Sequence, residues 1–179
     1  MNGNVFSLTP FPSDCVLHDL MISGGVERHS NMLNISILLT GHLSELVIPS
    51  AADLPARKNA LWEETCFELF LGLQNSEQYW EFNLSPAGHW NVYLFKTYRQ
   101  GMCEEPSFTS LPFSVHKQPG ALQLFLKFDL DKIIKADQLL KIGISAVIKF
   151  LNGRTSYWAL THTGPRPDFH LKDSFIVEL

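Results

Sequence analysis

Two glutamates stand inside stretches that have the residue pattern of a β-strand. Glu68 lies in CFELFL, and Glu81 lies in YWEFNL. Because successive side chains of a strand point to opposite faces, Glu68 shares a face with Phe70, and Glu81 shares a face with Asn83. Each carboxylate therefore stands close to apolar residues and needs a partner, a ligand or water.

If these stretches are neighbouring strands, two carboxyl groups and an amide lie on one sheet face. Two carboxylates repel each other unless a donor, a cation or a shared proton intervenes, so the patch suits a hydroxyl-rich ligand or a metal ion. Trp62 adds a large aromatic side chain of the kind that packs against the apolar side of a sugar ring. The alternative is an ordinary solvated face of an antiparallel sheet, which alternates in the same way.

Arg99 and two further tryptophans complete the residues of interest outside the C-terminal loop. Arg99 has aromatic neighbours that indicate partial burial, so we expect it to pair with a carboxylate on the polar face. Trp90 and Trp158 alternate with apolar residues and are expected in the core.

The C-terminal stretch THTGPRPDFH offers a second kind of chemistry. His162, Asp168 and His170 are the residue types of a zinc or iron site, and they are the basis of an alternative function, a metal-dependent or hydrolytic enzyme. Asp168 and His170 lie two residues apart behind Pro167, so an extended segment or loop can bring them to one point. Histidines at such places are more often ordinary hydrogen-bonding residues.

Two catalytic pairs can be written from residue types alone. Cys66 with His162 or His170 would be a nucleophile and its base, but Cys66 lies in mid-strand, which favours a buried structural cysteine. Glu68 and Asp168 would form a glycosidase pair only at a suitable separation, which a sequence does not give. The sequence therefore favours binding without turnover over catalysis.

The composition limits the class of protein. With 179 residues and 45% hydrophobic content, the chain is expected to form one globular domain over residues 1–179. The net charge of -4 comes without a Lys/Arg cluster, and no run approaches the roughly 20 apolar residues of a membrane span, so neither nucleic acid nor a membrane is an expected partner. Three cysteines without CxxC spacing, and an N-terminus unlike a secretory signal, predict a cytoplasmic protein.

Most stretches that look ordered alternate with period two and end at Gly, Pro, Asn or Ser. The turns QNSEQ, SPAGHW and LNGRT predict antiparallel hairpins. The pattern predicts an all-β fold, an antiparallel β-sandwich of jelly-roll type. Short helical connections are expected at 51–61 and 130–140. The expected strands are 4–9, 16–26, 31–40, 44–48, 65–73, 78–85, 90–96, 108–117, 120–129, 141–150, 154–161 and 172–179.

Trp62, then Glu68 inside a strand, and Asn83 at the end of a second strand resemble the family 9 carbohydrate-binding modules and the wider group of DOMON-like domains. The runs LWEETCFELF, YWEFNLSPAGHWNVYLFKTYRQGM and YWALTHTGPRPDFH are similar to a bacterial branch of DOMON-like proteins. The resemblance covers the chain from about residue 16 to its end. It implies a β-sandwich in which two aromatic residues enclose a sugar ring, while the glutamate and the asparagine bind its hydroxyl groups.

Two positions depart from the resembled pattern. Glu81 stands where sugar-binding members carry an arginine, so a bidentate donor is missing. Phe169 is the nearest equivalent of the second aromatic residue, and Arg166 in the same loop is expected to restore the donor. The resemblance and the polar face together imply a small, carbohydrate-like ligand held by Trp62, Glu68, Glu81, Asn83, Arg99, Arg166 and Phe169.

No cofactor is predicted. Some DOMON domains bind haem through a methionine and a histidine, but Met21, Met32 and Met102 match no such position, and methionine is more often a core residue. Calcium braces the sandwich in some members of the resembled families, and nothing in this sequence supports it. A purely structural or interaction domain without a small ligand stays open as a further alternative.

Overall fold

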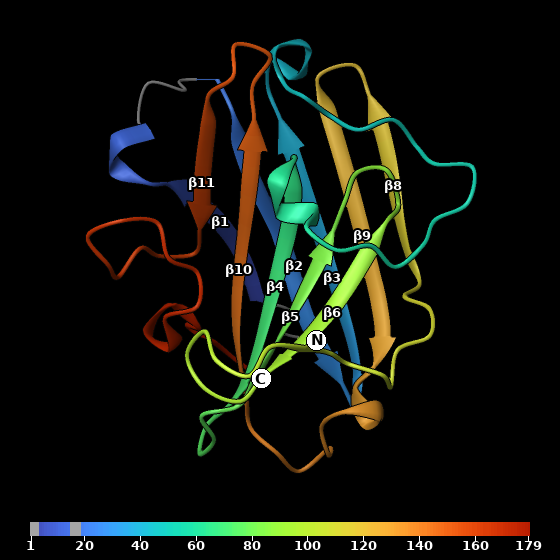
Figure 1. The fold of residues 1–179 in the computed structure, drawn as a ribbon, viewed down its shortest axis with the longest axis vertical. Coiled ribbons are helices and arrows are strands. Elements are labelled where there is room, and N and C mark those ends of the chain that lie inside the picture. The colour runs from blue at the N-terminus through green and yellow to red at the C-terminus, as the bar shows by residue number, and fades with distance from the viewer. Residues whose placement is uncertain (1–3, 15–18) are drawn as a thin grey trace.

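The computed structural model describes residues 4–14 and 19–179 and shows two packed layers of antiparallel strands (Figure 1). The front sheet has the order β7-β6-β5-β4-β10-β11, with β12 paired to β10, and the back sheet has the order β1-β2-β3-β9-β8. The all-β, antiparallel architecture predicted from the sequence is confirmed. The strands are β1 (Asn4–Pro10), β2 (Met21–His29), β3 (Met32–Thr40), β4 (Cys66–Leu73), β5 (Tyr79–Leu84), β6 (Trp90–Phe95), β7 (Cys103–Glu104), β8 (Phe113–Gln118), β9 (Ala121–Asp129), β10 (Leu140–Lys149), β11 (Thr155–Ala159) and β12 (Val177–Glu178).

Strand β1 joins the two sheets at one edge. Its residues 4–8 pair with β2 in the back sheet, whereas Thr9 and Pro10 pair with β11 in the front sheet. The ladder of hydrogen bonds therefore continues from one sheet into the other, and the whole sheet curls around its core.

The core lies between the two sheets and is built from alternate side chains of each strand. In β3, Leu33, Ile35, Ile37 and Leu39 are buried while the residues between them are partly exposed, as a half-buried strand requires. Trp90 and Trp158 are buried in this core, as their alternating neighbours predict. The front sheet also contributes Phe67, Leu69, Leu71, Trp80, Phe82 and Leu84.

The front sheet is covered on its outer face as well. A second cluster of buried aromatic side chains lies there, made of Phe70, Tyr79, Tyr93, Phe95 and Phe175. Phe175 comes from the C-terminal segment and lies so close to β10 that a Cβ atom at Gly143 would stand 2.7 Å from its ring. Strand β4 is consequently buried on both faces from Cys66 to Gly72, which explains the apolar residues on either side of Glu68.

The two predicted helical connections do not form α-helices. In 51–61, which contains Pro55, the chain is irregular until a single 3-10 turn begins, η3 (Leu61–Glu63). In 130–140 the helical part is η4 (Leu130–Lys132), because the Arg28 guanidinium takes up main-chain oxygens that a longer helix would use, those of Lys135, Ala136 and Gln138. No helix in the described ranges is long and apolar enough to cross a membrane.

Several predicted strands differ in extent. The segment 44–48 is not a strand, because Leu43 and Leu46 are both buried from a 3-10 turn, η2 (Leu43–Glu45), whose period of three brings them to one side. The predicted strand 172–179 is reduced to β12 after η5 (Lys172–Ser174), since Phe175 turns into the outer aromatic cluster. The strand predicted from 108 begins at Phe113. The one predicted over 16–26 begins at Met21 and extends to His29, and its first residues lie outside the described ranges.

Gly143→Ala tests the close approach of Phe175 to the front sheet. The new methyl group would lie 2.7 Å from the Phe175 ring and 3.4 Å from Cβ of Phe70, so the ring must move. We expect a loss of about 1–3 kcal/mol in the free energy of unfolding, the usual cost of overpacking. Urea unfolding measures it.

Gly25→Ala in β2 is the matched control, because a methyl group there meets its nearest atom at 3.6 Å, an ordinary contact. This variant should be as stable as the wild type or slightly more stable. Equal stabilities of the two variants would show that Phe175 does not press on Gly143.

Candidate functional site

A cavity of about 390 Å³ opens on the outer face of the front sheet, next to the second aromatic cluster. Its volume falls in the range of roughly 300–1,000 Å³ that is usual for small-molecule sites. The residues that line it are Trp62, Glu68, Glu81, Phe95, Arg99, Met102, Val147, Tyr157, Pro167, Phe169 and His170.

A wider groove of about 760 Å³ lies on the outer face of the back sheet. Its charged lining residues, Glu27 and Lys127, are exposed, and none of its polar side chains is buried. The front cavity holds buried carboxyl groups among aromatic side chains, so it is the better candidate for a functional site.

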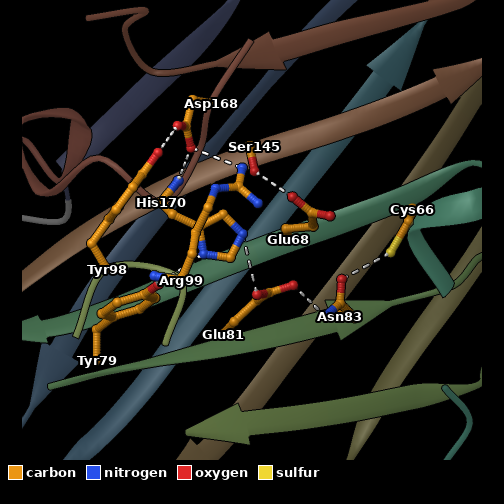
Figure 2. A network of polar contacts seen from close by, with 10 residues as sticks. All are labelled: Cys66, Glu68, Tyr79, Glu81, Asn83, Tyr98, Arg99, Ser145, Asp168 and His170. Carbon is orange, nitrogen blue, oxygen red and sulfur yellow. Dashed lines mark hydrogen bonds and ion pairs between the residues drawn. The ribbon is translucent and has the colours of Figure 1, made fainter. Parts of the chain in front are cut away.

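The strand register brings the predicted polar residues together. Glu68 on β4 lies opposite Asn83 on β5 and opposite Ser145 on β10, while Glu81 on β5 lies opposite Phe70. Strands β4 and β5 are thus hairpin partners, and the prediction that Glu68, Glu81 and Asn83 share one sheet face is confirmed. Figure 2 shows Glu68 and Glu81 on these neighbouring strands, each in contact with partners of its own.

Glu68 is held at the sheet by one hydrogen bond. Its Oε2 accepts from the Ser145 hydroxyl at 3.0 Å, and the residue is only 4% exposed. Burial raises the pKa of Glu68 to about 8, with a further rise from the charge of Glu81, against the opposing effects of Ser145 and Arg99. The carboxyl group is therefore largely protonated at neutral pH.

Glu81 has a similar environment. Its Oε1 accepts from Nδ2 of Asn83 at 2.7 Å, and Oε2 lies 3.7 Å from Nε2 of His170, which is longer than a hydrogen bond. Burial raises the pKa of Glu81 to about 7, although Asn83 and Arg99 stabilise the charged form. The two glutamates thus titrate as a pair in the range where most proteins carry fully ionised carboxylates.

His170 is neutral at physiological pH. Burial and the nearby Arg99 lower its pKa to about 4. The Tyr79 hydroxyl accepts from the main-chain N–H of Arg99 at 3.2 Å and lies 2.8 Å from Nδ1 of His170. The Tyr79 hydroxyl and Nδ1 of His170 thus share one hydrogen bond, which fixes the orientation of the imidazole ring.

Asp168 ties the C-terminal loop to the loop that follows β6. It accepts hydrogen bonds from the Tyr98 hydroxyl, from Nη2 of Arg99 at 2.9 Å and from its own loop, the main-chain N–H of His170. Burial alone would raise the pKa of Asp168, but these hydrogen bonds lower it. Arg99 does pair with a carboxylate, but the partner is Asp168 in the C-terminal loop and not, as the sequence had predicted, a carboxylate on the polar sheet face (Figure 2).

The other predicted ligand-binding residues divide into two groups. Trp62 is 36% exposed and lines the cavity, and Phe169 lines it as well. Asn83 is fully buried and does not line the cavity, so the structure does not place it in contact with a ligand. It donates a hydrogen bond to Glu81 instead and so fixes that carboxyl group. Arg166 is exposed and does not line the cavity, so the structure does not place it as a replacement donor.

The alternative metal site is not assembled. Asp168 is occupied by Tyr98 and Arg99, and Nε2 of His162 lies 2.9 Å from the main-chain oxygen of Thr9. In residues 4–14 and 19–179 no group of three or more His, Cys, Asp or Glu side chains is placed to hold a metal ion.

Cys66 is fully buried, and burial raises the pKa of its thiol well above the ordinary value. Its sulfur lies 3.6 Å from Oδ1 of Asn83. A buried thiol with a raised pKa is a poor nucleophile, which fits the structural role expected from its place in mid-strand.

Sequence reasoning missed part of the cavity wall. Tyr157 and Val147 are cross-strand neighbours on β11 and β10, and Val147 is also paired with Cys66, so they continue the site face across the sheet. The alternation of Tyr157 with the buried Ser156 and Trp158 was the available signal. Phe95 ends β6 opposite Tyr79, so strand alternation was the available signal for it as well. Met102 carries no comparable signal, because the loop after β6 decides its position.

The fold and the site together define an antiparallel β-sandwich with a ligand-sized cavity on one outer sheet face. A candidate carbohydrate-binding protein from Bacteroides uniformis has a similar structure, with a TM-score of 0.72 at 12% identity over 96% of this chain and 83% of its own. A family 9 carbohydrate-binding module from Caldicellulosiruptor kristjanssonii, solved with glucose and with cellotriose, gives a TM-score of 0.49 at 11% identity over 82% of this chain and 69% or 68% of its own. No protein-family model and no curated protein matches the sequence. At these identities the likeness shows the fold alone.

Glu81→Gln tests the burial of this carboxyl group. A pKa of about 7 in the folded state, against an ordinary 4.5, means that the folded protein holds the proton more tightly than the unfolded chain. The contribution of the protonated Glu81 to the free energy of unfolding is therefore fully present below about pH 4.5, and it is lost as the pH rises through about 7. The amide does not ionise, so we expect the stability of the variant relative to wild type to rise by on the order of 2 kcal/mol between about pH 5 and pH 8.

Urea unfolding at the two pH values measures this change. The control is Glu77→Gln, because the Glu77 side chain is 76% exposed and lies outside the cavity. The isosteric substitution keeps an oxygen to accept from Asn83, so a folding defect is not expected. A difference between Glu81→Gln and wild type that stays constant with pH would contradict the assignment.

Proposed function

We propose that this protein is a non-catalytic, carbohydrate-binding module of the DOMON-like type, whose ligand occupies the front-sheet cavity. The observation that carries the proposal is the placement of the half-exposed Trp62 beside the same cavity as the buried carboxyl groups of Glu68 and Glu81. Aromatic side chains pack against the apolar face of a sugar ring, and fixed carboxyl groups bind its hydroxyl groups, so the cavity offers both halves of sugar recognition.

The aromatic walls support this proposal. Phe169 and Tyr157 line the cavity together with Trp62, and the rings of Phe169 and Tyr157 lie 6.2 Å apart. Trp62 is itself packed edge-to-face against Tyr93 at 5.9 Å, which limits its freedom before a ligand binds. The similar structure from Bacteroides uniformis, a candidate carbohydrate-binding protein, is consistent with this function.

One observation favours a second function at the same place. Glycoside hydrolysis needs a neutral and an ionised carboxyl group near a sugar, and the raised pKa values of Glu68 and Glu81 provide that combination near neutral pH. Release of reducing sugar from oligosaccharides during a binding experiment would turn the assignment toward hydrolysis.

Tryptophan fluorescence tests the proposed function directly. Trp80, Trp90 and Trp158 are at most 5% exposed, so Trp62 is the tryptophan that a ligand can reach in the folded protein. Titration with a panel of mono- and oligosaccharides should give a saturable change for at least one sugar. Trp62→Ala should remove that change, and Trp62→Phe should restore part of the affinity.

Circular dichroism of both Trp62 variants checks that the fold is retained. Calorimetry with the same sugars guards against a ligand that binds without changing fluorescence. Silence in both measurements across the panel would refute carbohydrate binding.

Phe169→Ala tests the opposite wall of the cavity. Removing one aromatic contact should weaken binding of a responding sugar by about 5–10-fold, or roughly 1–1.4 kcal/mol. Phe125→Ala is the matched control, because Phe125 is a partly exposed phenylalanine on the outer face of the back sheet. Equal affinities for the two variants would remove Phe169 from the site.

A further inference from the structure

The front cavity has an uneven balance of charge. Glu68 and Glu81 both line it, and the basic residues that line it are Arg99 and His170, of which the histidine is neutral at physiological pH. The Arg99 guanidinium is paired with Asp168 at 2.9 Å. Its charge still favours the ionised forms of Glu68 and Glu81, but this effect is smaller than that of burial. Within the described residues, no lysine or arginine forms an ion pair with Glu68 or Glu81.

Each carboxyl group has one oxygen left for a ligand. Ser145 donates to Oε2 of Glu68, and Asn83 donates to Oε1 of Glu81. Oε1 of Glu68 has no hydrogen bond within the described ranges, and it is not among the fully buried polar atoms that lack a partner. Because Glu68 lines the cavity, this oxygen is open to a ligand. Oε2 of Glu81 lies 3.7 Å from His170, beyond hydrogen-bond distance, and stays available in the same way.

The walls of the cavity complement these acceptors. Trp62, Tyr157 and Phe169 present aromatic rings, whose faces attract a cation as well as the apolar side of a sugar. A neutral sugar would use the rings and accept or donate hydrogen bonds at the carboxyl groups. A ligand with a positive charge would in addition allow both buried carboxyl groups to ionise.

We propose that the ligand of this cavity is an amino sugar, a sugar ring whose free ammonium group is bound between the carboxylates of Glu68 and Glu81. This inference rests on the proposed carbohydrate-binding function and names the class of sugar. The ammonium group has three donors, and the free oxygens of Glu68 and Glu81 are acceptors for two of them. The aromatic walls hold the ring.

Proton release accompanies binding in this arrangement. Both glutamates hold protons near neutral pH because burial raises their pKa values to about 8 and about 7. A bound cation lowers those values, so protons leave the cavity when the ligand enters at about pH 6.5. The other titratable groups on the elements around the pair are Cys66 on β4, Tyr79 on β5, Tyr93 on β6, Tyr157 on β11, Tyr98 and Arg99 in the loop after β6, and Asp168 and His170 in the C-terminal loop.

Calorimetry at pH 6.5 with matched sugars tests the inference. The probes are sets of three with the same ring: glucose, glucosamine and N-acetylglucosamine, and the corresponding galactose and mannose series. In at least one set we expect the free amine to bind at least tenfold more tightly than the neutral hexose and the neutral N-acetyl sugar. The heat of binding in two buffers of different ionisation enthalpy should reveal net proton release.

Variants locate the ammonium group. Glu68→Gln and Glu81→Gln should each weaken binding of the amine at least tenfold more than they weaken binding of the neutral hexose, because the amide keeps hydrogen-bonding groups for a hydroxyl but loses the negative charge. The ionic-strength dependence of wild-type binding needs no variant, so it tests the charge contribution even if a substitution impairs folding. Glu77→Gln, outside the cavity, should leave both affinities unchanged.

The possible results separate the two proposals. If a neutral hexose binds as tightly as its amine, the amino-sugar inference is wrong and the carbohydrate-binding proposal stands. If the amine binds more tightly but neither glutamine variant weakens it, the placement between Glu68 and Glu81 is wrong. If no sugar of any set binds, the proposed function fails and the inference fails with it.

Discussion

The burial of two carboxyl groups on neighbouring strands is the constraint on which the outer face of the front sheet depends. Removing a carboxylate from water is costly unless it is hydrogen-bonded, paired or protonated. Here Glu68 and Glu81 receive one hydrogen bond each, from Ser145 and Asn83, and neither is paired with a lysine or arginine in the described part of the chain. The two carboxyl groups therefore avoid the free-energy cost of a buried charge by staying protonated. This makes the sheet face sensitive to pH and to any charge that enters the cavity.

The burial itself comes from the two loops that cover the sheet. The C-terminal segment brings Phe175 against Gly143 and places Phe169 and His170 over the strands, and Asp168 fixes it to Arg99. Without these loops Glu68 and Glu81 would lie on an ordinary solvated sheet face. The site is thus a product of long-range contacts, such as the one between Arg99 and Asp168, which lie 69 residues apart in the sequence.

Features that depend on neighbouring residues in the sequence could be predicted, whereas features that depend on contacts between distant segments could not. The strands, the hairpin of β4 and β5, and the shared face of Glu68 and Glu81 depend on alternation and on short turns, so they could be predicted. The segment 130–140 depends on Arg28, which lies about a hundred residues away and binds its main-chain oxygens, and no local pattern shows this. Met102 on the cavity wall was missed for the same reason, whereas alternation placed Tyr157 on a face without showing that this face lines a cavity. The exposed Arg166 was misplaced because loop geometry cannot be inferred from residue type.

The presence of Glu81 rather than a cation changes what the cavity can select. An arginine at that position would neutralise Glu68 and donate to hydroxyl groups, so the site would suit neutral or acidic sugars. Glu81 adds a second acid instead, and the nearest arginine, Arg99, is held by Asp168. An anionic ligand would then meet two acidic groups in a poorly solvated cavity, whereas a cationic one can take the place of their protons. Selectivity at this site is therefore decided by the charge of two residues on the sheet more than by the fold that carries them.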